Sequence, residues 1–227
     1  AIARRDGRVS GALRGEATGL DPGTAALRAA LGDSLRGGLR FDWSEGAPLE
    51  LSGIDLSGAD YGLAGALVVD GLTDPATLEL RPDLRLEAQD LSRFAQLAGL
   101  DLTGTAQLSL RGTLAPLTGR LALQLDGQTG DLATGVAQLD PLLTGTGDLS
   151  LTLSRDETGT RLAPLRITTD AARITGQADL QTCASRADLQ ARIADMAPVL
   201  HGLDGPASLD VQAEQTGEVW QLRLTSD

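Results

Sequence analysis

Two short stretches decide the fold of this 227-residue chain: Leu121-Ala122-Leu123-Gln124-Leu125 and Leu149-Ser150-Leu151-Thr152-Leu153. In both, leucine alternates with a small or polar residue. Because successive side chains of a β-strand point to opposite faces, the alternation gives each strand one apolar face and one wet face. This pattern is typical of an antiparallel sheet with one face in water, whereas a buried parallel strand is a continuous apolar run.

The same alternation recurs along most of the chain and predicts an all-β protein with many short strands. Further examples are Leu39-Phe41-Trp43, Leu78-Leu80, Leu84-Leu86, Leu108-Leu110, Leu165-Ile167, Leu209-Val211 and Trp220-Leu222-Leu224. Turn signals separate these runs, among them Asp126-Gly127, Thr158-Gly159 and Asp204-Gly205.

Helical signals are few and short. Residues 22–35 predict a helix with Thr24 as a candidate N-cap, and residues 92–99 predict one capped by Ser92 and ended by Gly99. Residues 141–143 and 197–202 predict single helical turns. The helices are therefore expected as connections between groups of strands.

The amino-acid composition argues against some classes of function. The net charge of −12 argues against DNA or RNA as a partner, since such binding depends on neutralising phosphates. Aromatic residues make up only 2% of the chain, although a closed β-sandwich normally fills its core with them. Two interpretations of the leucines follow: they line an open groove, or they pack on each other in an ordinary sandwich.

No pattern predicts catalysis, a metal or a cofactor. The single cysteine, Cys183, has no partner for a disulfide or a metal site, and the single histidine, His201, stands in a turn without a titratable neighbour. One degenerate glycine-aspartate motif at 145–149 is insufficient for calcium, which needs tandem copies. Nucleophile elbows, phosphate loops and dinucleotide fingerprints are absent from the sequence, so we expect no enzyme activity.

An internal duplication predicts two copies of one unit, at about residues 20–115 and 139–227. Leu39 and Phe41 match Leu149 and Leu151 at an offset of about 110 residues, and later anchors keep nearly the same spacing. Repetition of a β-unit predicts an extended architecture in which each unit leaves an apolar face to be covered. We expect residues 1–227 to be one fragment of a longer repetitive β protein.

The elements between the strands resemble those of a known family. The segment from Asp90 to Gly104 places a short helix between Asp90-Leu91 and Gly99-Leu100 and leads into strands of the form Leu-x-Leu. With the Leu-x-Ile element at 165–176, it is similar to the repeats of the TamB and AsmA-like family, over roughly residues 5–227.

The resemblance implies a long antiparallel sheet curled into a U-shaped apolar groove, with short helices between repeat units. It also implies a periplasmic location at the inner membrane of a Gram-negative bacterium, with the membrane anchor outside this fragment. Phospholipid acyl chains and an outer-membrane barrel assembly subunit are the implied partners, in lipid transport and in the assembly of outer-membrane proteins and autotransporters.

The side chains expected to contact lipid are those on the apolar face of the strands. They are Leu39, Phe41, Ile54, Leu56, Leu63, Leu108, Leu110, Leu121, Leu123, Leu149, Leu151, Leu165, Ile167 and Ile174. Two other functions fit the same pattern: a protein-binding module that pairs client strands at its sheet edge, and a piece of a secreted β-solenoid adhesin.

Overall fold

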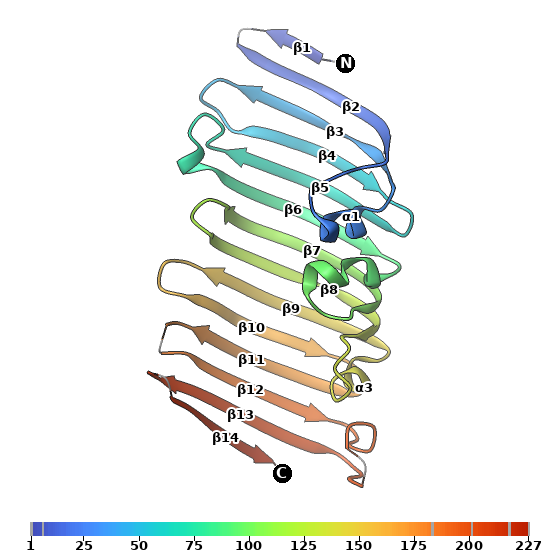
Figure 1. Cartoon of the computed structure of the whole chain (residues 1–227), viewed down its shortest axis with the longest axis vertical. Coiled ribbons are helices and arrows are strands. Elements are labelled where there is room, and N and C mark those ends of the chain that lie inside the picture. Colours follow the sequence, from blue (N-terminus) through green and yellow to red (C-terminus); the bar gives the residue numbers. More distant parts are fainter. Residues whose placement is uncertain (1, 6, 183, 201, 218, 227) are drawn as a thin grey trace.

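The computed structural model describes residues 2–5, 7–182, 184–200, 202–217 and 219–226, with side chains from residue 7 onward. It shows one antiparallel sheet of fourteen strands, each paired with the next in the chain (Figure 1). The strands are β1 Ile2–Arg5, β2 Arg8–Thr18, β3 Ser34–Ser44, β4 Leu49–Ser57, β5 Tyr61–Asp70, β6 Glu79–Ala88, β7 Thr103–Ala115, β8 Arg120–Ala133, β9 Thr146–Arg155, β10 Thr160–Thr168, β11 Ala172–Leu180, β12 Arg186–Ile193, β13 Ala207–Thr216 and β14 Val219–Ser226. The predicted all-β architecture is confirmed, and the sheet does not close into a barrel.

The connections between strands differ between the two sides of the sheet at which the strands end. On one side, which we call the helix edge, the connections carry α1 Ala25–Leu31, the 3-10 helix η2 Leu91–Phe94, α2 Ala95–Ala98 and α3 Asp140–Leu143 (Figure 1). The opposite edge, the turn edge, is made of tighter connections, one of which holds η1 Pro75–Thr77. Short helices between the strands were predicted, and they are present.

The helix boundaries correct two of the predictions. α1 begins after the predicted cap, since the Thr24 hydroxyl accepts a hydrogen bond from the Leu27 N–H at 3.3 Å, but it ends at Leu31 rather than at residue 35. Residues 91–98 form η2 and α2, capped by Asp90 instead of Ser92; the Asp90 carboxylate accepts the Ser92 N–H at 2.8 Å. Gly99 ends α2 in the left-handed conformation, as predicted.

The Asp126-Gly127 turn prediction was wrong. Both residues lie inside β8, where Gly127 pairs with Leu108 on one side and with Leu149 on the other. A Cβ atom at Gly127 would stand 2.0 Å from the Gln107 carbonyl oxygen and 2.9 Å from a methyl group of Leu108. Glycine is therefore required at this position because neighbouring strands pack closely on the inside of the curved sheet, and it does not form a hairpin turn.

The strand order repeats once along the sheet. Four strands, a helix-edge connection and two strands run from β3 to β8, and the same order runs from β9 to β14. The bulge that precedes Ile54 in β4 has a counterpart before Leu165 in β10. Since a β-bulge bends and twists a strand, both six-strand groups curl at a corresponding place.

Most of the buried side chains lie at the helix edge, whereas Ile54 in the middle of β4 and Val69 and Ser185 at the turn edge are buried elsewhere. Leu91 packs with Tyr61, Ala88 and Ala106, while Leu142 packs with Ala172 and Ile193. We call these groups the first and second rim clusters. Among the described residues no side chain is less than 2% exposed, so the sheet has no second layer sealing its apolar face.

Candidate functional site

The candidate site is the apolar face of the sheet, where side chains from successive strands stand in register. Because directly paired residues share a face, the strand pairing defines continuous rows across the molecule. One row contains Leu56, Leu63, Leu86, Leu108, Gly127, Leu149, Ile167, Ile174, Ala191 and Leu209. A second row contains Gly65, Leu84, Leu110, Leu125, Leu151, Leu165, Gly176, Leu189 and Val211.

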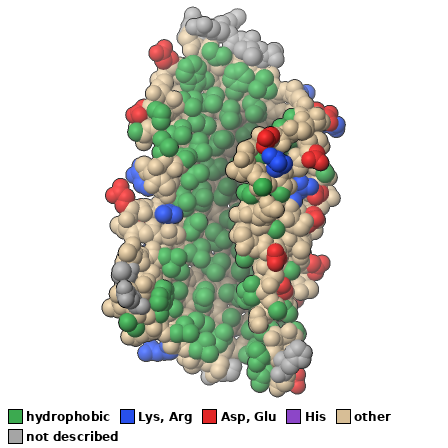
Figure 2. Space-filling view, viewed as in Figure 1, with side chains coloured by type: hydrophobic (Ala, Val, Ile, Leu, Met, Phe, Trp, Pro, Cys, Tyr) green, Lys and Arg blue, Asp and Glu red, His purple; other side chains and the backbone are tan. Residues whose placement is uncertain are grey.

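These rows form the floor of an open groove along the long axis of the molecule. Figure 2 shows the apolar side chains as a continuous band, with the helix edge raised beside it. Neighbouring strands of a sheet lie about 4.8 Å apart, so the rows from β4 to β13 extend for roughly 45 Å. The hydrocarbon core of a bilayer is about 30 Å thick, and one leaflet supplies half of that. The floor is therefore long enough for an acyl chain.

The exposure of the fourteen predicted side chains supports an open face. Thirteen of them are half-buried, and Ile54 is buried with 8% of its surface exposed. The chain exposes 14262 Å² in total, whereas a compact monomer of 23.4 kDa exposes about 9,700 Å². An excess of this size is expected when one sheet face lacks a covering layer.

Several floor residues lie outside the predicted set. Leu84, Leu86, Leu125 and Leu189 stand in the same rows as the predicted leucines. The period-two alternation of apolar residues that identifies the predicted set also marks these leucines. The inward glycines such as Gly176 carry no apolar signal, and only the pairing of strands assigns them to the floor.

The opposite face of the sheet is polar and carries ion pairs between neighbouring strands. Arg111 pairs with Asp83 at 3.1 Å, and Arg36 pairs with Glu16 at 3.1 Å. All four side chains are more than half exposed, so water screens these pairs and they contribute little stability. Their role is to keep this face in water and so to leave the leucine face as the one available for apolar contact.

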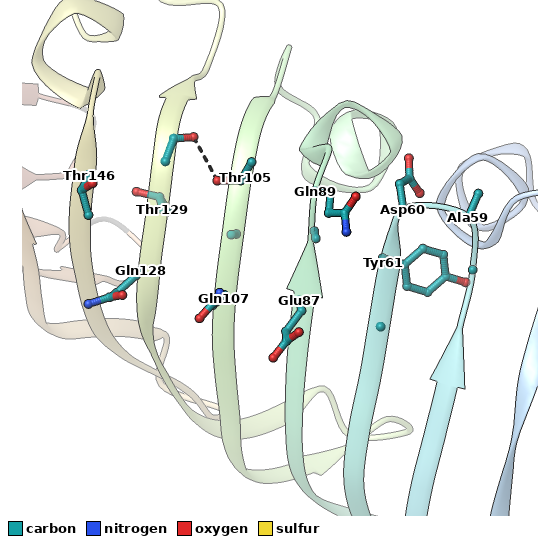
Figure 3. Close-up of a pocket in the computed structure, with 15 residues that line it drawn as sticks. Ala59, Asp60, Tyr61, Glu87, Gln89, Thr105, Gln107, Gln128, Thr129 and Thr146 are labelled. Carbon is teal, nitrogen blue, oxygen red and sulfur yellow. Dashed lines mark hydrogen bonds between the residues drawn. The ribbon is translucent and has the colours of Figure 1, made fainter.

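The polar face also contains a shallow hollow of about 570 Å³ where β5 to β9 approach the helix edge (Figure 3). Glu87, Gln107 and Gln128 project from adjacent strands beside it, and the Thr105 hydroxyl donates to the Gly130 carbonyl at 3.5 Å. These groups are amides, a hydroxyl and a carboxylate, and Asp60 and Tyr61 line the same hollow beside the helix edge.

A network of side chains fixes the helices beside the groove. Arg93 forms an ion pair with Asp60, stands 5.3 Å from the Tyr61 ring centre and donates to the Ala29 carbonyl of α1 at 3.2 Å. The Tyr61 hydroxyl donates to the Leu31 carbonyl at 3.1 Å. Burial raises the pKa of Tyr61, and the hydrogen bond to Asp60 raises the pKa of Arg93. No local sequence pattern indicates this long-range network.

Aspartates stabilise two further connections at the helix edge, those between β8 and β9 and between β12 and β13. The Asp140 carboxylate accepts the Thr134 N–H at 2.7 Å, and the Asp195 carboxylate accepts N–H groups of Ala197 and Gly205 at 3.1 and 3.0 Å. These backbone hydrogen bonds lower the pKa of Asp140 and of Asp195. A lowered pKa here marks a structural cap on a loop, because N–H groups favour the charged carboxylate.

The remaining candidates from the sequence are a cysteine, a histidine and groups of possible metal ligands. Cys183 and His201 lie outside the described residues. Within the described part of the chain, histidine, cysteine and acidic side chains do not gather in groups of three that could hold a metal ion. None of the helices described there has the length and apolar character needed to span a bilayer.

Comparison with protein families, curated proteins and solved structures finds no match to this chain.

Proposed function

We propose that the chain is a passive carrier segment whose groove shields the acyl chains of phospholipids from water. The observation that carries this proposal is the in-register apolar floor, whose side chains keep part of their surface exposed and face no second sheet among the described strands. Each methylene moved from water into apolar surroundings is worth about 0.8 kcal/mol. A chain half-immersed in an open groove gains on the order of 6 kcal/mol, which corresponds to weak, reversible binding. Reversible binding suits a protein that passes lipids along its surface better than one that stores them.

The wider setting of the proposal follows the resemblance to the TamB and AsmA-like family. In that setting the chain is part of a periplasmic bridge that is anchored in the inner membrane and cooperates with an outer-membrane barrel subunit. The bridge serves phospholipid transport and the assembly of outer-membrane proteins. No step in this function needs a catalytic group, because moving a lipid along the groove breaks no covalent bond.

Site-specific photocrosslinking tests the lipid contact. A photoreactive amino acid at Leu123 or Leu151 should crosslink to phospholipid during exposure to vesicles. The same amino acid at Gln124 or Thr152 serves as the control, since these neighbours point to the polar face. Equal crosslinking from both faces, or crosslinking from neither, would contradict the proposal.

A further inference from the structure

The charged residues of the strands lie almost entirely on one face of the sheet. Wherever a charged residue of β2 to β14 has a cross-strand partner, it lies on the polar face, with one exception among the described residues. The exception is Arg155 at the end of β9. It pairs with Leu121 of β8 on one side and with Thr160 of β10 on the other, and both of these lie on the apolar face.

Arg155 interrupts an apolar row that follows the turn edge of the groove. The row runs from Leu114 to Leu121, then through Arg155 and Thr160, and continues at Leu180. A guanidinium and a hydroxyl therefore stand side by side where the neighbouring strands place leucine. Both groups can donate hydrogen bonds, and directly paired Cβ atoms lie about 5 Å apart.

Arg155 has no acidic partner. Within the described residues it lies in no ion pair, and the same holds for Arg166 on the polar side of β10, whereas Arg161 on that side lies 3.7 Å from Asp179. Its position on the apolar face, and not the missing partner, is what sets Arg155 apart. Two acids follow Arg155 in the turn. The Asp156 carboxylate is occupied by the N–H and hydroxyl of Thr158 and by the Gly159 N–H, which lower its pKa. Glu157 is exposed at the tip of the turn.

We propose that Arg155 and Thr160 bind the anionic head group of an amphiphile whose hydrocarbon chain lies on the groove floor. The aliphatic stem of arginine can cover Leu121 while the guanidinium stays at the wet margin of the groove. There it meets a carboxylate or a phosphate, the anions whose geometry it matches best. This inference rests on the proposed function, and it adds that the groove prefers anionic amphiphiles to neutral ones.

Binding of palmitate and of its neutral counterpart monopalmitin to the 227-residue chain tests the inference. We expect Arg155→Gln to weaken palmitate binding about two- to fivefold, the range of a solvent-exposed ion pair, and to leave monopalmitin binding unchanged. Arg155→Lys should retain part of the preference because it keeps the charge. The matched control is Arg166→Gln, which removes the same charge from the polar face of β10 and should change neither ligand.

Three results with palmitate and monopalmitin would overturn the inference. These are an equal loss from Arg166→Gln, an equal loss of palmitate and monopalmitin in Arg155→Gln, or no preference for palmitate in the unmodified chain. Inorganic phosphate is the third probe: tight competition by phosphate alone would indicate a free-anion site instead of a head-group site. The pair of ligands separates the two proposals: failure of both palmitate and monopalmitin to bind refutes the lipid groove itself, whereas binding of both without a role for Arg155 refutes only the head-group site.

Discussion

Replacing Leu151 by aspartate tests whether the groove floor is open. Leu151 lies at the centre of the sheet between Leu125 and Leu165 and is half-buried. Full burial of a leucine side chain is worth about 1.5–3 kcal/mol, so a half-buried one contributes roughly 1 kcal/mol. On an open floor the new carboxylate keeps its contact with water. We therefore expect Leu151→Asp to lower the free energy of unfolding by about 1–3 kcal/mol and to leave the chain folded.

The same substitution should have a much larger effect on lipid binding. An acyl chain lying over residue 151 would strip water from the carboxylate, and burying an unpaired charge costs several kcal/mol. We expect the affinity for a fluorescent fatty acid to fall at least tenfold. Urea unfolding followed by circular dichroism measures the first effect, and a titration of the fluorescent probe measures the second.

Two control variants make the outcome decisive. Thr152→Asp adds the same charge on the polar face and should change neither stability by more than about 1 kcal/mol nor lipid affinity. Leu142→Asp places the charge in the second rim cluster, where Leu142 is 5% exposed, and should cost more than about 4 kcal/mol. An open floor is ruled out if Leu151→Asp destabilises the chain as much as Leu142→Asp does, and acyl-chain binding over residue 151 is ruled out if the variant binds the probe as well as the unmodified protein.

Three further predictions concern the framework of the groove. Gly127→Ala should destabilise the chain by about 1–3 kcal/mol in urea unfolding, because its Cβ would overlap the Gln107 carbonyl; an unchanged midpoint would contradict the packing role of this glycine. Tyr61→Phe should cost about 1 kcal/mol through the lost hydrogen bond to Leu31, with Trp220→Phe, in an exposed position, as the control. The lowered pKa of Asp140 means that its contribution is fully present above the unfolded-state pKa near 4 and is lost as the pH falls through the lower folded-state pKa. Asp140→Asn should therefore flatten the pH dependence of unfolding below about pH 4, and an unaltered slope would argue against the cap.

The amphipathic period of the strands let the sequence predict the overall architecture. In the stretch from Leu121 to Leu125 each side chain is assigned to a face by parity alone, and no knowledge of neighbours is needed. The caps at Thr24 and Gly99 could be predicted from the sequence as well, because a cap acts within one turn of its own helix. Local rules of this kind fix which face is apolar and where the chain leaves a strand.

What the sequence could not decide depends on residues far apart in the chain. Asp126-Gly127 has the form of a hairpin signal, yet the crowding of Leu108 against β8 places that glycine on the groove floor. The contact of Arg93 with the Ala29 carbonyl joins residues that are 64 positions apart. Whether leucine-faced strands close into a sandwich or remain an open trough is also a tertiary matter, since the same alternation satisfies both. The pairing of every strand with its chain neighbour, and the curl from bulges and inward glycines, leave the leucine face uncovered.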